Sequence, residues 1–305
     1  MKKYKVAVIT RTKDRKILVQ RAIKSVLGQT FGNWIMVIVN DGGNKEEINE
    51  LAAKYGDKFG DRLLIVHNKK SLGMEAASNI GIKSSDSEYV VIHDDDDSWH
   101  PLFLQKCVQF LDSNPYPSVA GVITYTIRVI ERLENGKLIT EREEPFNLWL
   151  KSVNIFRMAS NNVFPPISFL FKREVFDKIG YYRDDLPVLG DWEFNLRYIS
   201  KYDIFLIPEK LAYYHHRLET KEGIYSNSVV KDDNKHKFYD ALLRNELLRQ
   251  DLEKNVIGMG YLVNISKSFE DIHSQIYPIE RFFNRLRSIN WFRKLIKNLI
   301  LKSPK

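Results

Sequence analysis

Short apolar runs alternate with amphipathic stretches along the first hundred residues of the chain. Some stretches repeat hydrophobic residues at near-helical spacing, and the runs between them are rich in the β-branched residues typical of strands. Such an alternation predicts parallel strands joined by helices, which cover the faces of the sheet. The expected strands are 5–10, 34–39, 63–67 and 89–93, and the expected helices are 16–28, 45–55 and 74–83.

Beyond Pro101 the pattern changes. An Asn-Gly pair between two alternating runs indicates a β-hairpin, and long irregular segments over an α/β sheet often carry specificity. We therefore expect the irregular stretch 145–166 to lie near an acceptor. The other expected elements are a helix over 102–112, strands over 119–131 and 138–143, and a helix over 236–254.

The fourth expected strand, in YVVIHDDDDSWHP, runs into four consecutive aspartates, Asp94 to Asp97. Adjacent like charges raise each other's pKa unless a cation neutralises them, and oxygen ligands suit Mg²⁺ or Mn²⁺. Because alternate residues at a strand end point the same way, Asp94 and Asp96 are expected to share a face. A solvated acidic turn is the plainer interpretation of such a run. A position at the carboxyl edge of an α/β sheet, where ligands bind, favours a metal site.

The ends of the first two strands bring Arg11, Thr12 and Asp41 to the same edge. Asp41 can accept hydrogen bonds from a base or a ribose, so the edge suits a nucleotide whose diphosphate lies on the metal. A turn-forming aspartate is the alternative for Asp41. The chain has neither the GxGxxG fingerprint after its first strand nor a GxxxxGK[ST] loop. A metal would therefore have to carry the phosphate charge.

Five stretches give the chain a family resemblance. In order they are VAVITRTKDR, IVNDGG, SLGMEAASNIGI, YVVIHDDDDSWHP and LPVLGDWEFNLRY. Together they resemble the landmarks of the family 2 glycosyltransferases, inverting enzymes with the GT-A fold, over about residues 4–220. The resemblance implies a Rossmann-like, mostly parallel sheet flanked by helices, followed here by a C-terminal helical extension. It also implies a nucleotide-sugar donor, with a UDP-sugar favoured, and a divalent metal, Mn²⁺ or Mg²⁺.

The resemblance also implies roles for individual residues. The segment Asp94-Asp95-Asp96 matches the DXD motif, which binds the metal and the ribose and diphosphate of the donor. Thr12 and Asp41 match residues that line the nucleoside pocket. The expected donor-binding residues are Arg11, Thr12, Asp41, Asp94 and Asp95, and the expected metal ligands are Asp96 and His216.

The chain departs from the family pattern at three places. Arg11-Thr12-Lys13-Asp14 stands where many members have Pro-Thr-Tyr-Asn, which changes the expected surroundings of the base. Ser78 stands where many members have an arginine, which removes one expected contact to the donor. Gly190 stands where the Glu-Asp pair of the family has its glutamate, which removes an acid beside Asp191.

Asp191 is the expected catalytic base. Inverting transfer requires one base to take the proton of the acceptor hydroxyl while a metal stabilises the departing diphosphate. Glu193 lies two residues further along the same expected helix and cannot face the same direction. The resemblance selects Asp191, and capping of that helix by the Asp191 side chain is the structural alternative.

The stretch AYYHHR holds two histidines. On a strand, His215 and His216 point to opposite faces, so only one of them reaches the site. The resemblance places near this point a histidine that completes the metal shell or touches the diphosphate, and His216 is the better match. A buried, hydrogen-bonded histidine is the alternative. Arg217 could neutralise phosphate oxygens.

The net charge of +8 belongs to the end of the chain. Residues 281–305 hold eight Lys and Arg and no acid, so residues 1–280 are formally neutral. This distribution argues against nucleic acid as a partner. The tail is also rich in aromatic and aliphatic residues, which suits a helix on an anionic membrane surface. Packing on the main domain or on another subunit is the alternative.

A single cysteine, Cys107, and the lack of any apolar run of about 18 to 20 residues favour a cytoplasmic protein, peripheral at the inner face of the cell membrane. The expected domains are a glycosyltransferase domain over 1–220 and a helical extension over 221–305. Within the first domain, 1–101 is the expected donor half and 102–220 the expected acceptor half.

The expected function is metal-dependent inverting transfer of a sugar from a nucleotide diphosphate sugar to a hydroxyl of a glycan or lipid-linked glycan, as in bacterial surface polysaccharide synthesis. A nucleotidyltransferase is the first alternative, since Arg11, Lys13 and Arg15 could cradle a triphosphate. The second is a non-catalytic carbohydrate- or membrane-binding module, which predicts that loss of Asp191 changes nothing.

Overall fold

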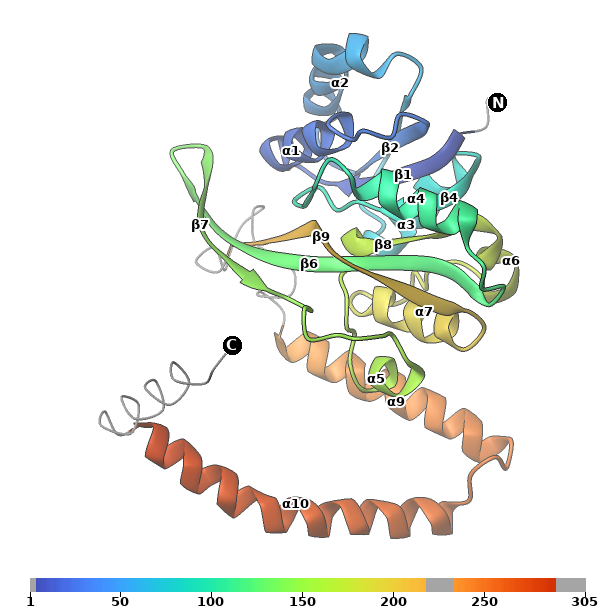
Figure 1. The fold of residues 1–305 in the computed structure, drawn as a ribbon, viewed down its shortest axis with the longest axis vertical. Helices are drawn as coiled ribbons and strands as arrows, with labels where there is room; N and C mark the ends of the chain where they lie inside the picture. The colour runs from blue at the N-terminus through green and yellow to red at the C-terminus, as the bar shows by residue number, and fades with distance from the viewer. Residues whose placement is uncertain (1–3, 218–232, 289–305) are drawn as a thin grey trace. The chain divides into compact units, whose positions relative to one another are not determined.

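The computed structural model describes residues 4–217 and 233–288 (Figure 1). The chain divides into two compact units, Met1–Asp240 and Ala241–Lys305. The first unit contains all the residues that sequence analysis assigned to donor, metal and base. The expected boundary at residue 220 stays a prediction.

One sheet of nine strands organises the first unit (Figure 1). The strands are β1 (Tyr4–Thr12), β2 (Trp34–Asp41), β3 (Leu63–Asn68), β4 (Ser87–Ile92), β5 (Ser98–Trp99), β6 (Val119–Glu134), β7 (Lys137–Pro145), β8 (Phe169–Lys172) and β9 (Asp203–His216). Their order is β3-β2-β1-β4-β8-β6-β9-β5, and β7 pairs with β6. The first four are parallel, whereas β8 runs antiparallel to both β4 and β6.

Helices pack on this sheet. They are α1 (Lys16–Leu27), α2 (Lys45–Phe59), α3 (Met74–Lys83), α4 (Phe103–Ser113), α5 (Ile155–Ser160), α6 (Phe176–Ile179) and α7 (Gly190–Ile199), with short 3-10 turns η1 (Pro166–Ser168) and η2 (Arg173–Val175). Successive residues of β1 face opposite sides. Val8 joins the core formed with α1, α2 and α4, whereas Ile9 lies next to Gly81 of α3.

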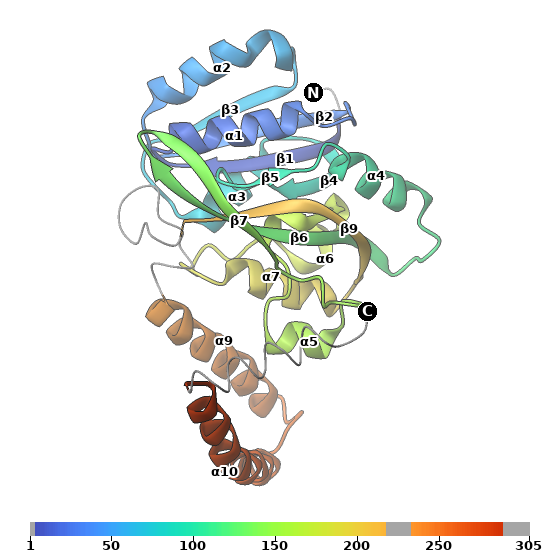
Figure 2. The same cartoon turned by 60° about the vertical axis from the view of Figure 1, so that its left-hand side comes forward.

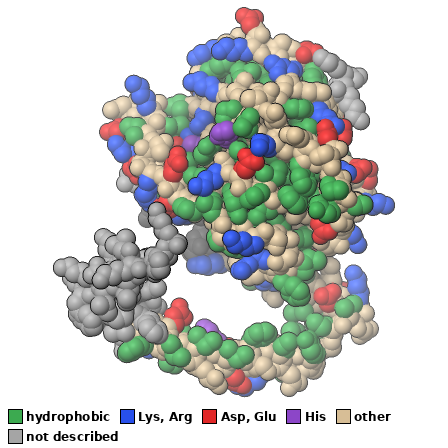
Figure 3. Space-filling model, viewed as in Figure 1, with side chains coloured by type: hydrophobic (Ala, Val, Ile, Leu, Met, Phe, Trp, Pro, Cys, Tyr) green, Lys and Arg blue, Asp and Glu red, His purple; other side chains and the backbone are tan. Residues whose placement is uncertain are grey.

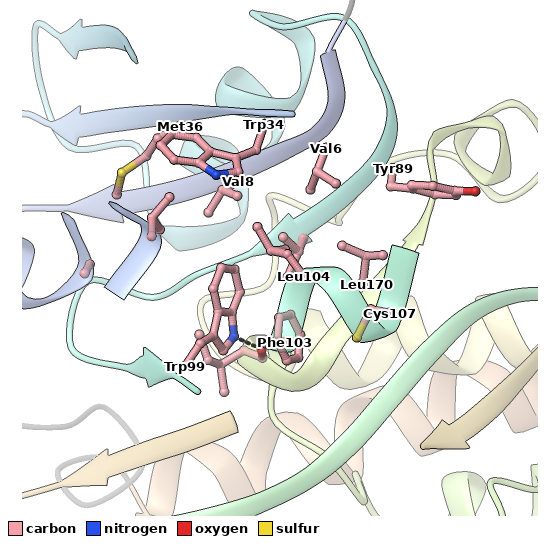
Figure 4. Close-up of a cluster of buried hydrophobic side chains, with 14 of the residues drawn as sticks. Val6, Val8, Trp34, Met36, Tyr89, Trp99, Phe103, Leu104, Cys107 and Leu170 are labelled. Carbon is pink, nitrogen blue, oxygen red and sulfur yellow. Dashed lines mark hydrogen bonds between the residues drawn. The ribbon is translucent and has the colours of Figure 1, made fainter. Parts of the chain in front are cut away.

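The core between the sheet and α4 is built around Trp99 (Figure 4). Its ring stacks on Phe103 with centroids 4.5 Å apart, and its Nε1 donates a hydrogen bond to the Ile167 carbonyl at 2.7 Å. The buried tryptophan therefore has its polar atom satisfied. Because Trp99 lies two residues after Asp97, this packing fixes the chain just beyond the aspartate run.

The expected α/β architecture with alternating strands and helices is confirmed. The parallel strands β3-β2-β1-β4 are followed by β8, which runs in the opposite direction, and parallel pairing returns between β6 and β9. The expected hairpin is present as β6 and β7, and it extends beyond the rest of the sheet (Figure 2). The stretch expected to be irregular, 145–166, contains the short helix α5.

The C-terminal part of the chain contains two helices, α9 (Asp233–Glu253) and α10 (Met259–Ser288). Hydrophobic side chains are exposed along α10 (Figure 3), among them Met259, Tyr261, Val263, Phe269, Ile272, Ile276, Tyr277, Ile279 and Phe282. No helix in the described residues combines the length and apolarity needed to cross a membrane. Most of the basic tail, 289–305, lies outside the described residues.

Candidate functional site

The four aspartates do not continue strand β4. The strand ends at Ile92, and the Asp97 amide donates a hydrogen bond to the Asp94 carbonyl at 3.2 Å, which closes a turn. The expectation that Asp94 and Asp96 share a face is therefore wrong, because the run leaves the strand conformation before alternation can apply. Each of the four side chains has a different set of partners.

Asp94 and Asp95 pair with the end of β1 and the start of α1. Arg11 Nε lies 2.9 Å from Asp94 Oδ1, and Arg15 Nη1 lies 3.0 Å from Asp95 Oδ1. The Thr12 hydroxyl donates a hydrogen bond to Asp95 Oδ2 at 2.7 Å. Burial raises the pKa of Asp95 to about 6 against the opposing effect of Arg15. Parallel pairing of β1 with β4 thus brings four expected donor-binding residues together.

Asp96, the expected metal ligand, lies between two arginines. Arg217 is completely buried and donates a hydrogen bond to Asp96 Oδ2, and Arg15 Nη1 lies 3.7 Å from the same oxygen. Burial alone would raise the pKa of Asp96, but Arg217, Arg15 and Arg21 lower it. The charge of this carboxylate is thus balanced by guanidinium groups of the protein itself.

Glu131 of β6 is a site residue that sequence reasoning missed. Its carboxylate accepts hydrogen bonds from Arg217 Nη1 at 2.7 Å and from Arg21 Nη1 at 2.6 Å, and it lies 2.9 Å from His215 Nδ1. Burial would raise the pKa of Glu131, but the bonds from His215 and Arg21 lower it to about 2. The available signal was a carboxylate that directly follows the apolar residues Val129 and Ile130 in a predicted strand.

The two histidines have different surroundings, as strand alternation predicts. The His215 amide donates a hydrogen bond to Asp97 Oδ1 at 2.9 Å, and its ring Nε2 lies 2.8 Å from the Ser98 hydroxyl. His216 is buried, and its Nε2 has no hydrogen-bond partner among the described residues. Burial lowers the pKa of His216 to about 4. Its role as a metal ligand stays a prediction.

Asp41 organises the loop that leads into α3. Its carboxylate accepts hydrogen bonds from the Asn68 side chain at 2.8 Å, the Ser71 hydroxyl at 2.7 Å and the amides of Leu72 and Gly73 at 2.9 and 3.1 Å. Burial would raise the pKa of Asp41, but these hydrogen bonds lower it. Its predicted contact to the nucleoside stays a prediction, and it has a structural role as well.

Asp191 lies in the first turn of α7. Leu189 occupies the N-cap position with a left-handed backbone, φ 64°, but the Asp191 side chain still binds an amide of the first turn, as the capping alternative expects. Asp191 Oδ2 accepts a hydrogen bond from Asn162 Nδ2 at 2.8 Å, and Oδ1 accepts one from the Trp192 amide at 2.8 Å. Burial raises the pKa of Asp191 against the Trp192 bond and the charge of Arg11. The carboxylate is thus oriented while its proton affinity is increased.

Two further contacts join Asp191 to its surroundings. Trp192 Nε1 donates a hydrogen bond to the Met158 carbonyl at 2.7 Å, which fixes α5 against α7. With Asn162, this contact places the stretch 145–166 beside Asp191. On the donor side, the charge of Arg11 lowers the pKa of Asp191 and Arg11 is paired with Asp94. Asp191 and the aspartate turn therefore both feel the charge of Arg11.

The described residues contain no group of three or more His, Cys, Asp or Glu side chains arranged to hold a metal ion. The reason is that Arg11, Arg15 and Arg217 pair with the carboxylates of the turn. A divalent ion at a nucleotide site commonly takes only one or two carboxylates and completes its shell with phosphates and water. Asp96 and the unpartnered His216 Nε2 fit such an incomplete protein shell.

The sequence model of glycosyl transferase family 2 matches residues 7–180. The chain belongs to glycosyl transferase family 2. It is thus a glycosyltransferase, and this membership sets the nucleotidyltransferase alternative aside. The matched region contains the aspartate turn, Asp41 and Thr12, whereas Asp191 lies beyond it.

Relatives of this chain carry the same general description. An uncharacterized glycosyltransferase of Haemophilus influenzae is 22% identical over 309 residues, which cover 98% of this chain and 96% of the relative. YwdF, an uncharacterized glycosyltransferase of Bacillus subtilis, is 23% identical over 205 residues, 67% of this chain and 71% of YwdF. An Escherichia coli protein provisionally named colanic acid biosynthesis glycosyl transferase WcaA is 35% identical over 97 residues, 32% of this chain and 34% of WcaA.

Solved structures share the fold. Staphylococcus aureus TarS 1–349 in complex with UDP-GlcNAc superposes with a TM-score of 0.54 at 18% identity, covering 72% of this chain and 59% of TarS. The mannosyltransferase PcManGT of Pyrobaculum calidifontis, in complex with GDP-Man and Mn²⁺, gives a TM-score of 0.51 at 18% identity, covering 70% of this chain and 57% of that one. This chain thus spans about three fifths of these solved chains. The expected GT-A fold is confirmed.

Proposed function

We propose that this glycosyltransferase is metal-dependent and inverting. It moves a sugar from a nucleotide diphosphate sugar to a hydroxyl of a glycan or lipid-linked glycan. The observation that carries the proposal is that Arg11 pairs with Asp94 of the Asp94–Asp97 turn and that the charges of both residues act on Asp191. A site that holds the diphosphate at one wall and a base at the other has the parts that one displacement at the anomeric carbon requires.

Asp191 is the base of this proposal. The acceptor oxygen forms the new bond to the anomeric carbon, and the bond from that carbon to the phosphate oxygen breaks. The nucleoside diphosphate leaves with the bonding electron pair, and the acceptor proton moves to the Asp191 carboxylate. The hydrogen bonds from Asn162 and Trp192 hold that carboxylate in one orientation during the transfer.

The donor end of the site would be held by residues of three strand ends. Thr12 and Asp41 would hold the nucleoside and Asp94 and Asp95 the ribose and diphosphate, with Arg11 beside them. Asp96 and His216 would hold Mn²⁺ or Mg²⁺. When bound, the ion supplies positive charge to the phosphate oxygens of the donor. The solved relatives that bind UDP-GlcNAc, or GDP-Man with Mn²⁺, support a nucleotide-sugar donor.

The acceptor is proposed from different observations. The stretch 145–166 contacts Asp191 through Asn162, so it borders the side from which an acceptor approaches. The relationship to WcaA supports a role in surface polysaccharide synthesis. The basic, apolar tail 281–305 supports contact with an anionic membrane surface, where a lipid-linked acceptor would be found.

Calorimetric titration of UDP and GDP tests the proposal. The titrations use Mn²⁺, Mg²⁺ or EDTA, and they compare the wild type with Asp96→Asn and with the exposed control Asp57→Ala. We expect one nucleotide to bind with a metal, to lose affinity with EDTA and in Asp96→Asn, and to keep it in Asp57→Ala. A folded wild type that binds neither nucleotide would contradict the proposal and favour a non-catalytic binding module.

A further inference from the structure

Glu75, in the first turn of α3, is a buried carboxylate that no part of the proposed mechanism uses. Its side chain is 4% exposed. The attractive charge acting on it is that of Arg11, while Asp191 and Asp94 repel it. No Lys or Arg forms an ion pair with it in the described residues. Burial without such a partner is costly for a carboxylate, so its position calls for a functional reason.

The Glu75 side chain occupies the space next to Gly190. A Cβ atom built on Gly190 would lie 2.3 Å from Glu75 Cγ and 2.5 Å from Glu75 Oε1. These distances are far below van der Waals contact, so a side chain at position 190 requires the Glu75 side chain to move. Residue 190 is the position at which the family resemblance leads us to expect a glutamate. In this chain, α3 supplies a carboxylate to the space that α7 leaves empty.

One helical turn further along α3, a second expected charged residue is missing and another element again supplies the charge. Arg11 Nη1 donates a hydrogen bond to the Ser78 hydroxyl at 2.8 Å, and Ser78 stands where the resemblance leads us to expect an arginine. The guanidinium thus reaches this point from β1. Two departures from the family pattern are matched by charged groups from other elements, which is difficult to explain by packing alone.

The backbone around Glu75 is fixed on both sides. Asn79 Nδ2 donates a hydrogen bond to the Tyr182 carbonyl at 2.8 Å, and the Tyr182 amide donates one to Asn79 Oδ1 at 3.1 Å. This reciprocal pair joins α3 to the segment that precedes α7. On the other side, Asp41 holds the amides of Leu72 and Gly73. The carboxylate of Glu75 is therefore held at a defined place beside Asp191.

We propose that Glu75 recognises the transferred sugar by accepting a hydrogen bond from one of its hydroxyl groups. This inference rests on the proposed function. If the diphosphate lies at the Asp94–Asp97 turn and the acceptor hydroxyl at Asp191, then the sugar ring lies between them. Glu75 borders that region next to Gly190, and carboxylates are strong acceptors for the hydroxyl groups of sugars.

The test compares the affinity for a sugar nucleotide with the affinity for its bare nucleotide. Calorimetry with Mn²⁺ uses UDP, UDP-GlcNAc, UDP-glucose, UDP-galactose, GDP and GDP-mannose. The proteins are the wild type, Glu75→Gln and Glu75→Ala. We expect Glu75→Ala to weaken binding of the preferred sugar nucleotide about 10- to 100-fold, the loss of one charged hydrogen bond, and to leave the bare nucleotide unchanged. Glu75→Gln should show a smaller loss and a changed order of preference among the sugars.

A relocation variant provides the matched control. Gly190→Glu alone should be less stable than the wild type, because its side chain would displace that of Glu75. Glu75→Ala with Gly190→Glu removes the overlap and returns a carboxylate to the same space from α7. We expect this double variant to be more stable than Gly190→Glu alone. It should also bind the preferred sugar nucleotide at least tenfold more tightly than Glu75→Ala does, a difference of about 1.4 kcal/mol.

The remaining outcomes separate the two proposals. Sugar-nucleotide affinity that is unchanged in Glu75→Ala would overturn the role of Glu75 and leave the glycosyltransferase proposal standing. An equal loss for sugar nucleotides and bare nucleotides would also overturn it, since it would indicate a structural role only. A folded wild type that binds none of these nucleotides would overturn the proposed function and this inference with it.

Discussion

Arg217 and Asp96 form a buried ion pair at the position where sequence analysis placed a metal ligand. The second branch of the Arg217 guanidinium donates a hydrogen bond to Glu131 at 2.7 Å. One arginine therefore joins the aspartate turn to strand β6, and removing it leaves two buried carboxylates without this partner. Removing one partner of a buried ion pair leaves the other charge buried and unpaired, which costs more free energy than the intact pair contributes.

Arg217→Met should lower the free energy of unfolding by about 3 to 5 kcal/mol. The measurement is urea denaturation followed by circular dichroism. Arg132→Met is the matched control, because Arg132 is a β6 arginine whose pairs with Glu134 and Glu141 are exposed. The control should leave the midpoint unchanged. Equal midpoints for Arg217→Met and the wild type would mean that the buried network contributes little to stability.

Stability should depend on pH through Glu75. Burial raises the pKa of Glu75 from its ordinary 4.5 to about 7, with Arg11 opposing and Asp191 and Asp94 adding to the shift. At a pH between 4.5 and about 7, Glu75 is protonated in the folded chain and ionised in the unfolded chain. The contribution of neutral Glu75 is therefore complete below pH 4.5 and is lost as the pH rises through 7.

We expect the fall in unfolding free energy between pH 4.5 and pH 8 to be smaller in Glu75→Gln than in the wild type, by up to about 3 kcal/mol. Urea denaturation across this pH range measures the difference. Parallel pH profiles for the two proteins would show that Glu75 keeps its ordinary pKa in the folded chain. The readout needs no substrate, so it is independent of the proposed donor.

Asp191→Asn should slow sugar transfer about 100- to 10,000-fold, because the amide cannot accept the proton of the acceptor hydroxyl. Nucleotide binding should remain, since Asp191 lies apart from the aspartate turn. Glu193→Gln is the control, because Glu193 is the other acid of α7 and pairs with Arg197 at 2.6 Å. Transfer rates and calorimetry would reveal a wrong base if Glu193→Gln lost turnover and Asp191→Asn kept it.

The packing of α3 on the sheet can be tested at Gly81. A Cβ atom at this position would lie 2.5 Å from Ile9 Cγ2 and 3.0 Å from Val39 Cγ2. Gly81→Ala should therefore destabilise the fold by about 1 to 3 kcal/mol through overpacking. Gly56→Ala, in the open space around α2, should instead stabilise it by about 0.5 to 1 kcal/mol. Thermal denaturation compares the two variants. A change of melting temperature in the same direction for both would contradict the close approach of α3 to strands β1 and β2.

The fold could be predicted where periodicity is strong. The helix expected over 74–83 is α3, and the first four strands lie where their apolar runs predicted them. The reversal at β8 could not be predicted, because Phe169–Lys172 is a short apolar run whose direction depends on which neighbours it pairs with. Strand direction is a tertiary property that local patterning does not encode.

The candidate site was predicted in part for a similar reason. The aspartate run, Asp191 and the histidine pair were visible as unusual residues in local patterns. Glu131 was not, because its partners Arg21 and Arg217 are 110 and 86 residues away in the chain. The exchange at Gly190 also stayed hidden, since the group that fills its space is on α3. Pairings over such separations follow from sheet register and helix packing.

The carboxylate of Asp41 links the two ends of the proposed donor site. It holds the amides of Leu72 and Gly73, and α3 begins at the next residue, with Glu75 in its first turn. Any rearrangement of Asp41 on contact with a nucleoside therefore shifts the backbone that carries Glu75. By thermodynamic linkage, a sugar that binds well to Glu75 would strengthen binding of the nucleobase by the same factor by which the nucleobase strengthens binding of the sugar. Specificity for the two ends of the donor would then be a joint property and not a sum of two independent choices.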